Sequence, residues 1–134
     1  MVFLALLLPL VYVIGLMAGV QRALLATSSA AREVGRVWVT SQDAASARTR
    51  AAVAFQDVMG NFGYPPGDRN TSLEVCVGPP SCAGAFGPGA ELRVRVVERV
   101  PVFRVPFLGA LAGPVLPVGA TNRTRVDRYR GLAP

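Results

Sequence analysis

The residues best suited to chemistry in this sequence are two cysteines, Cys76 and Cys82, which lie six positions apart in the segment CVGPPSC. Two thiolates cannot complete the four-ligand shell of a structural zinc ion, and the sequence has no histidine to add to them. The pair also lacks the two-residue spacing of redox-active dithiols. In an oxidising compartment the same spacing closes a short loop across a Pro-Pro turn, so we expect a structural disulfide and no metal.

The missing histidine and the scattered acids argue against catalysis. Without histidine the chain cannot build a Ser-His-Asp triad, a Cys-His pair or a histidine general base. Spacing alone pairs none of the carboxylates considered, which are Asp43, Asp57, Asp68, Glu74, Glu91 and Glu98. We therefore expect a protein that is not an enzyme, holds no cofactor and takes no small-molecule substrate.

The basic residues form two pairs with the same spacing. All fourteen are arginines, and the net charge is +6. Arg93 with Arg95, and Arg123 with Arg125, are two positions apart, which places each pair on one face of a strand. Two interpretations remain open: solvated sheet faces, or a basic strip that contacts an acidic neighbouring subunit or phosphate headgroups. Aromatic residues do not interleave with these arginines, so we do not expect nucleic acid as a partner.

The start of the sequence is apolar, and the first charge is Arg22. A helix over residues 2–21 is about 30 Å long, the thickness of a bilayer's hydrocarbon core. Membrane helices tolerate a proline such as Pro9, and Gly15 with Gly19 forms a G-x-x-x-G spacing that lets another helix approach. Three uses are open: a cleaved signal peptide, a retained anchor or the spine of a filament.

The apolar face continues beyond the membrane segment. Apolar or small residues recur every three or four positions, and they are Ala23, Leu24, Thr27, Ala30, Ala31, Val34, Val37 and Trp38. This predicts one long helix, with residues 1–21 in the membrane and 22–38 outside it. The positive-inside rule, applied to Arg22, Arg32 and Arg36, favours a cytoplasmic domain. The expected disulfide favours the opposite side, so we expect a single-pass protein with its domain outside the cytoplasm.

The segment after the long helix predicts a second helix over residues 41–60. In TSQD, Thr40 or Ser41 can cap this helix, and an acid in its first turn suits the positive helix end. Apolar residues keep helical spacing until GNFGYPPG, where glycines and two prolines end the helix.

From residue 71 the apolar period changes to two. SLEVCVG and AELRVRVVERV alternate as strands with one apolar and one polar face, and a slip at Val96–Val97 predicts a bulge or a strand end. Prolines and glycines over 101–119 predict a loop, and a last strand is expected near Val118–Arg130. The predicted fold class is α+β, with a small antiparallel β domain over 71–134.

The segment ALLLPLVYVIGLMAGVQRALLATSSAAREVGR resembles the N-terminal helix of TadE-like pseudopilins of the TadE/TadG family. The resemblance extends through the second helix, the Cys-bearing strand, the Val/Arg strand, the Pro-rich loop and a terminal strand that ends in Arg, so it covers nearly the whole chain. It implies a minor pilin anchored in the cell membrane, a structural component of tight-adherence (Flp, type IV) pilus assembly. The implied partners are membrane lipid, other pilin subunits and the assembly platform. The family carries a glutamate where this chain has Phe3, so these residues do not support prepilin-peptidase cleavage or the glutamate contact that registers pilin helices.

The alternative function is a secreted or surface binding module. Small residues in LLATSSA could form a signal-peptidase site near residues 26–31. The released domain would then use its basic strip to bind an anionic partner. The N-terminus of the mature protein separates the two functions.

Overall fold

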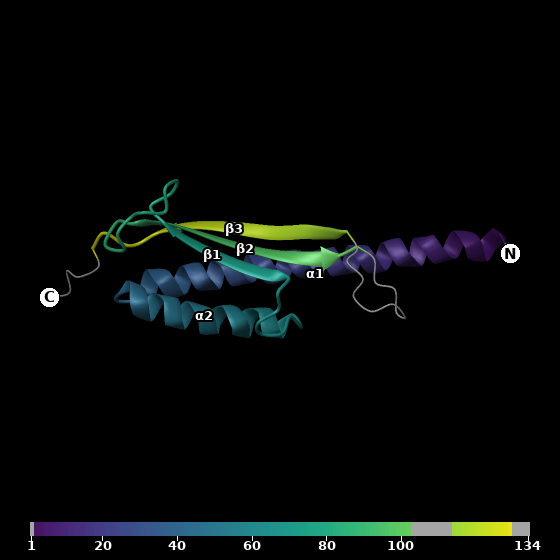
Figure 1. The fold of residues 1–134 in the computed structure, drawn as a ribbon, viewed down its shortest axis with the longest axis horizontal. Helices are drawn as coiled ribbons and strands as arrows, with labels where there is room; N and C mark the ends of the chain where they lie inside the picture. The colour runs from purple at the N-terminus through teal and green to yellow at the C-terminus, as the bar shows by residue number, and fades with distance from the viewer. Residues whose placement is uncertain (1, 103–113, 130–134) are drawn as a thin grey trace.

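The computed structural model describes residues 2–102 and 114–129 (Figure 1). Within these residues two helices precede a three-stranded antiparallel sheet. The elements are α1 (Val2–Thr40), α2 (Ala44–Asn61), β1 (Thr71–Val77), β2 (Glu91–Pro101) and β3 (Val115–Arg125). The predicted α+β fold is confirmed, with the apolar start forming the first half of α1.

α1 is one continuous helix of 39 residues, and it ends at Thr40 rather than at residue 38. The predicted cap of the second helix at Thr40 or Ser41 is wrong, because both hydroxyls serve the end of α1. Thr40 donates to the carbonyl of Arg36 at 3.0 Å, and Ser41 donates to that of Val37 at 2.6 Å. These bonds hold both hydroxyls against the last turn of α1, so neither side chain is turned toward the start of α2.

α2 begins three residues after the predicted position 41. Its N-cap is Asp43, whose carboxylate accepts from the backbone N–H groups of Ala45 and Ser46 at 2.9 and 2.8 Å. A carboxylate here satisfies two free donors and faces the positive end of the helix. The helix ends at Asn61, and Gly63 follows with a φ of 86°, which favours glycine.

The sheet has the order β1-β2-β3, and both neighbouring pairs are antiparallel. Leu92, Val94 and Val96 of β2 are buried on its inner face. The predicted break at Val96–Val97 is wrong, because the pairing of β2 with both neighbours continues through this point without an extra residue. Glu98 takes the next inward position after Val96, and Val97 points outward. The apolar pattern of the sequence is therefore interrupted here although the strand is regular.

The predicted loop over 101–119 is wrong at both ends. β2 includes Pro101, and β3 already begins at Val115. β3 ends at Arg125, before the predicted limit at Arg130. Pro117 is accommodated because β3 is an edge strand, and Pro101 lies beyond the end of β1. The remainder of the predicted loop, 103–113, and position 130 lie outside the described residues.

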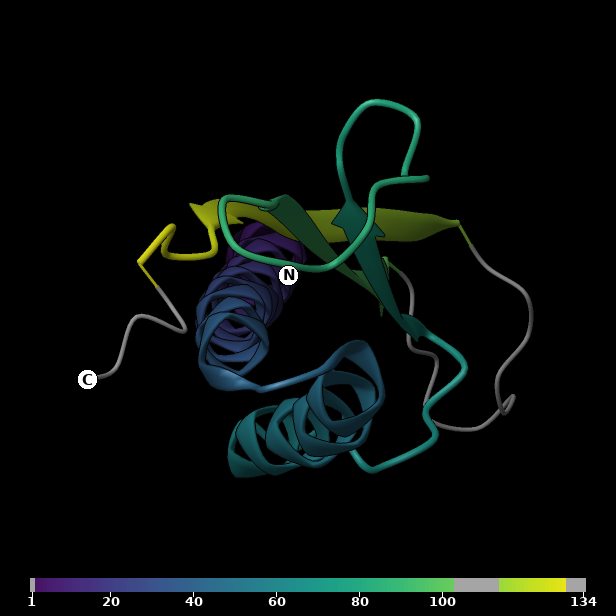
Figure 2. The ribbon, with the colours of Figure 1, turned by 90° about the vertical axis from the view of Figure 1, so that its left-hand side faces the viewer.

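The core forms where α1 lies against both α2 and the sheet. Both helices cover the same face of the sheet, and α1 runs directly along β2 and β3 (Figure 2). The buried residues of α1 are mainly small: Ala23, Ala26, Thr27, Ala30, Ala31, Val34, Gly35, Val37 and Trp38. The predicted member Leu24 is exposed, and Ala26 is buried instead. In the described part of the chain no helix covers the other face of the sheet (Figure 2).

Candidate functional site

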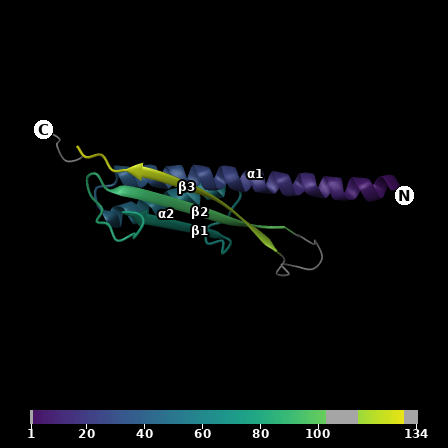
Figure 3. The same cartoon turned by 90° about the horizontal axis from the view of Figure 1, so that it is seen from above.

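The apolar first half of α1 projects beyond the rest of the molecule (Figure 3). This part of the helix is long and apolar enough to cross a membrane, and none of its most apolar window is buried. Its most exposed large apolar residues are Val2, Phe3, Leu4, Leu6, Leu8, Leu10, Val11, Val13, Ile14 and Met17. Full burial begins at Ala23, directly after the first charge at Arg22. The boundary predicted between residues 21 and 22 therefore coincides with a change in packing.

The three predicted helix-packing residues have different surroundings. Pro9 lies in the projecting part, and the helix continues through it. A Cβ atom on Gly15 would meet no described atom within 4 Å. A Cβ atom on Gly19 would lie 3.9 Å from Val100 Cγ1 of the same chain. The G-x-x-x-G spacing is therefore partly covered by the molecule's own sheet.

A cavity of about 580 Å³ lies where the projecting half of α1 meets the sheet. Tyr12 and Arg22 line it from α1, and Glu98 and Arg99 line it from β2. Tyr64 lines it from the segment between α2 and β1. Sequence analysis missed this junction, because its residues come from three segments that no local spacing connects.

Glu98 is the buried ionisable group at this junction. Its side chain is on a residue only 3% exposed, and the Thr71 hydroxyl donates to it. Burial raises the pKa of the Glu98 carboxyl, with a further contribution from Asp68, while the Thr71 hydrogen bond acts in the opposite direction. Burial also raises the pKa of Tyr64, and the negative charge of Glu98 adds to that effect. The sequence signal for Glu98 was the slip at Val96–Val97.

The predicted basic strip lies on the outer face of the sheet. Arg93 of β2 is directly opposite Arg123 of β3, and Arg95 is opposite Thr121. Glu74, Arg93, Arg95 and Arg123 line one shallow depression on this face. Arg125 is opposite Glu91, at the end of the ladder. The structure thus brings together Arg93, Arg95 and Arg123, and Arg125 continues their row.

The arginines of this strip are not neutralised by close ion pairs. Among the described residues, the salt bridge within 4 Å is that between Glu33 and Arg36, at 2.6 Å on α1. Like charges directly opposite each other in a sheet are unfavourable. The Arg93–Arg123 pairing therefore gives the outer face a positive surface without stabilising the sheet.

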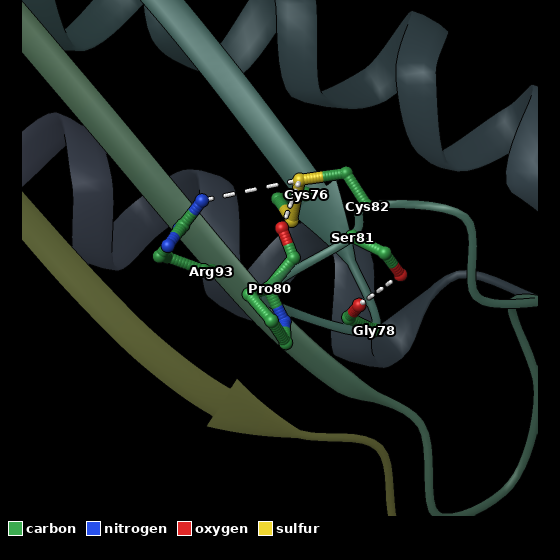
Figure 4. Close-up of a disulfide and its surroundings, with 6 residues drawn as sticks. All are labelled: Cys76, Gly78, Pro80, Ser81, Cys82 and Arg93. Atoms are coloured by element: carbon green, nitrogen blue, oxygen red, sulfur yellow. Dashed lines mark hydrogen bonds between the residues drawn. A yellow bond between two sulfur atoms is a disulfide. The ribbon is translucent and has the colours of Figure 1, made fainter.

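The predicted disulfide between Cys76 and Cys82 is confirmed, with an S–S distance of 2.04 Å. It ties the end of β1 to the loop that follows, and Arg93 Nη2 lies 3.9 Å from Cys82 Sγ (Figure 4). Cys76 is buried although the predicted polar face of β1 includes it. In the same loop a Cβ atom on Gly78 would lie 2.9 Å from Gly84 Cα, so two glycines allow the chain to close back on itself.

The described residues contain no group of three His, Cys, Asp or Glu side chains that could hold a metal ion. No protein-family model, curated protein or solved structure matches the chain. The resemblance to TadE-like pseudopilins therefore stays a prediction that rests on the sequence pattern. The structure thus combines an exposed apolar half of α1 with a small domain that has a basic outer sheet face and one disulfide.

Proposed function

We propose that this chain is a membrane-anchored structural subunit, a minor pilin or pseudopilin of tight-adherence (type IV) pilus assembly. In this proposal the first half of α1 lies in the bilayer and the sheet domain lies outside the cytoplasm. The subunit acts by contacting lipid, other pilin subunits and the assembly platform, and it thereby serves adhesion without catalysing a reaction.

The observation that carries this proposal is the division of α1 into an exposed apolar half and a packed half. A helix of 39 residues is about 58 Å long, nearly twice the hydrocarbon thickness of a bilayer. Only its second half is needed for the core. The exposed half is therefore free to occupy a membrane or the core of a filament while the domain stays folded.

The disulfide supports the location outside the cytoplasm. Structural disulfides persist in oxidising compartments and are rare in reducing ones. The Cys76–Cys82 bridge therefore favours export of the domain, against the positive-inside reading of Arg22.

The test has two parts. Intact mass and N-terminal sequencing of the protein from its native membrane fraction, without reductant, should find residues 2–21 retained and both cysteines oxidised. Cells that lack the gene should lose pili in electron micrographs, and the full chain should restore them. Normal piliation without the gene contradicts the pilus assignment, while free thiols on a retained helix contradict the topology.

The second candidate function, a released binding module, is favoured by the unpaired charge of the Arg93–Arg123 row. It faces a packing objection, because cleavage near residues 26–31 removes Ala23 and Ala26, both 0% exposed in the core. A mature N-terminus between residues 26 and 31 favours this second function over the first.

A further inference from the structure

The end of β2 lies beside the projecting half of α1, and the start of β3 is paired with it on the side away from β1 (Figure 1). The Tyr12 hydroxyl donates to the carbonyl of Val102, which follows β2. Gly19 faces Val100 of β2, since a Cβ atom on Gly19 would lie 3.9 Å from Val100 Cγ1. This end of the sheet therefore reaches about 15 Å along α1 beyond Arg22, the distance from Arg22 to Tyr12 at helical rise.

The charged residues of α1 and of β2 stop at the same height along α1, and among the described residues only uncharged ones lie beyond it. Arg22 is the first charge of α1, and Arg99 is the last charged residue of β2. The two arginines line the same cavity. Beyond that level the described sheet end consists of uncharged residues, which are Val100, Pro101, Val102, Pro114, Val115, Leu116 and Pro117. Arg104 lies outside the described residues.

Both faces of this sheet end are apolar and open. Leu116 is opposite Val100 on the face toward α1, and Val115 is opposite Pro101 on the outer face. Leu116 is 43% exposed and Val115 is 48% exposed. A partner helix or a second sheet covers one face of a strand pair, whereas lipid surrounds both. The outer face nearer the disulfide is instead basic, with Arg93, Arg95 and Arg123.

The backbone at this end leaves few donors unpaired, which matters because each unpaired donor costs several kcal/mol in lipid. On the open edge of β3 the N–H of Val115 is the donor that remains without a strand partner among the described residues. The backbone N–H of Arg99 donates to the carbonyl of Asn70, on the β1 side of β2. Pro101, two residues later, faces the same side and has no N–H that needs a partner. Pro117 likewise removes a donor from edge strand β3. Val102 donates to the carbonyl of Pro114, which cannot donate in return, and Tyr12 supplies the missing donor to Val102.

We propose that the paired ends of β2 and β3 are inserted into the bilayer beside α1, so that the protein contacts acyl chains through two elements rather than through one helix. Arg22 and Arg99 then mark the headgroup level, where long basic side chains reach water and phosphate. Leu116 and Val115 lie below that level, on opposite faces of the sheet. This inference rests on the proposed function only in that α1 crosses a membrane.

The test measures lipid contact at single positions of the full chain. Leu116→Cys and Val115→Cys are labelled with the fluorophore NBD under non-reducing conditions, which keep Cys76–Cys82 bonded. Each protein is reconstituted into vesicles of phosphatidylethanolamine and phosphatidylglycerol whose acyl chains are brominated. Leu8→Cys, in the projecting helix, is the lipid control, and Thr121→Cys, on the outer face beside Arg123, is the water control.

The expected result is that both labels at the sheet end lose emission to bromolipid to the same extent as position 8 and are insensitive to iodide in the water. Position 121 should show the reverse. If position 8 contacts lipid while 115 and 116 respond to iodide, the insertion is wrong and the anchor stands. If position 8 also responds to iodide, the anchor itself is wrong, and the insertion with it. Labels shielded from both quenchers, with energy transfer between copies, would assign this end to a second copy and overturn the proposal.

Discussion

The two halves of α1 share one helical backbone but have opposite surroundings. From Val2 to Met17 the helix displays large apolar side chains with nothing of the described chain covering most of them. From Ala23 to Trp38 it is enclosed by α2 on one side and by β2 and β3 on the other. Arg22 separates the two halves and lies at the cavity between helix and sheet.

The difference lies in side-chain size more than in apolarity. The enclosed half places Ala23, Ala26, Ala30 and Ala31 at its contacts, which lets neighbouring backbones approach. Gly35 is the extreme case, because a Cβ atom there would lie 2.7 Å from Asn122 Nδ2. Small side chains suit the half that receives two neighbouring layers, and large ones suit the contact with lipid or a filament core that we propose for the other half.

The largest expected effect comes from placing a carboxylate in each half. Val34→Asp puts a charge at a position 0% exposed, so we expect the free energy of unfolding to fall by about 4 kcal/mol. Val13→Asp should leave that free energy unchanged and weaken membrane insertion by about 3 kcal/mol. Urea unfolding of the full chain in detergent, followed by fluorescence of the single tryptophan Trp38, measures the first effect. Alkaline extraction of membranes measures the second.

The two variants are informative together because each is expected to change one property, stability or membrane insertion, and to leave the other unchanged. If Val13→Asp also unfolds the domain, the projecting half is part of the fold rather than an independent surface. If Val34→Asp leaves the urea midpoint unchanged, the enclosed half is not the core.

The next effect concerns the end of the domain farthest from the projecting helix (Figure 1). Replacing both Cys76 and Cys82 by Ala opens a short loop, and the entropy of the unfolded chain then lowers the free energy of unfolding by about 2 kcal/mol. Membrane retention should not change, because the loop has no part in α1. Ser81→Ala, in the same loop, is the control. Loss of membrane retention in the double variant would show that the two ends are coupled.

Glu98 provides a smaller effect that depends on pH. Burial raises the pKa of this carboxyl in the fold, so the folded chain holds the proton more tightly than the unfolded chain does. Its contribution to stability is therefore present below the unfolded pKa and is lost as pH rises through the folded pKa. Glu98→Gln, which can still accept from Thr71, should remove that decline and raise stability at neutral pH by about 1 kcal/mol.

Urea unfolding of Glu98→Gln and the parent chain at a series of pH values checks this. Glu74→Gln, exposed on β1, removes the same charge without a buried site and should keep the decline. The difference in free energy of unfolding between the two chains isolates Glu98, because the lowered pKa values of Glu33 and Asp43 contribute equally to both. If the parent gains stability relative to Glu98→Gln as pH rises, hydrogen bonding to the charged carboxylate outweighs burial.

Much of the fold could be predicted from the sequence, because the signals are local. The 3.6-residue period identified α1 beyond Arg22, the two-residue period identified β1 and β2, and the Cys76–Cys82 spacing predicted the bridge. The co-facial row of arginines followed from strand alternation alone.

The errors arose where a distant contact decides the local structure. Pro117 is typical of a loop, yet it lies in β3. A proline is tolerated there because β3 is an edge strand, where a missing N–H breaks no bond to a neighbouring strand. Glu98 reads as a break in the pattern, yet its inward position is set by pairing with both neighbouring strands. Tyr12 reads as one more apolar residue of α1, and only the fold brings its hydroxyl to Val102.

The smallest expected effect tests whether the outer face of the sheet, unlike the projecting helix, lies in water. Arg123→Thr removes a like-charge pair with Arg93, so we expect a gain in the free energy of unfolding of about 0.5 kcal/mol at low salt. Arg125→Thr removes an opposite-charge pair with Glu91 and should lose a similar amount. The shared substitution cancels the strand propensity of threonine, and about 1 M salt should abolish both effects by screening. Equal signs at low salt would mean that side-chain packing, not charge, decides the stability of this face. Effects that survive high salt would mean that the arginines are shielded from water.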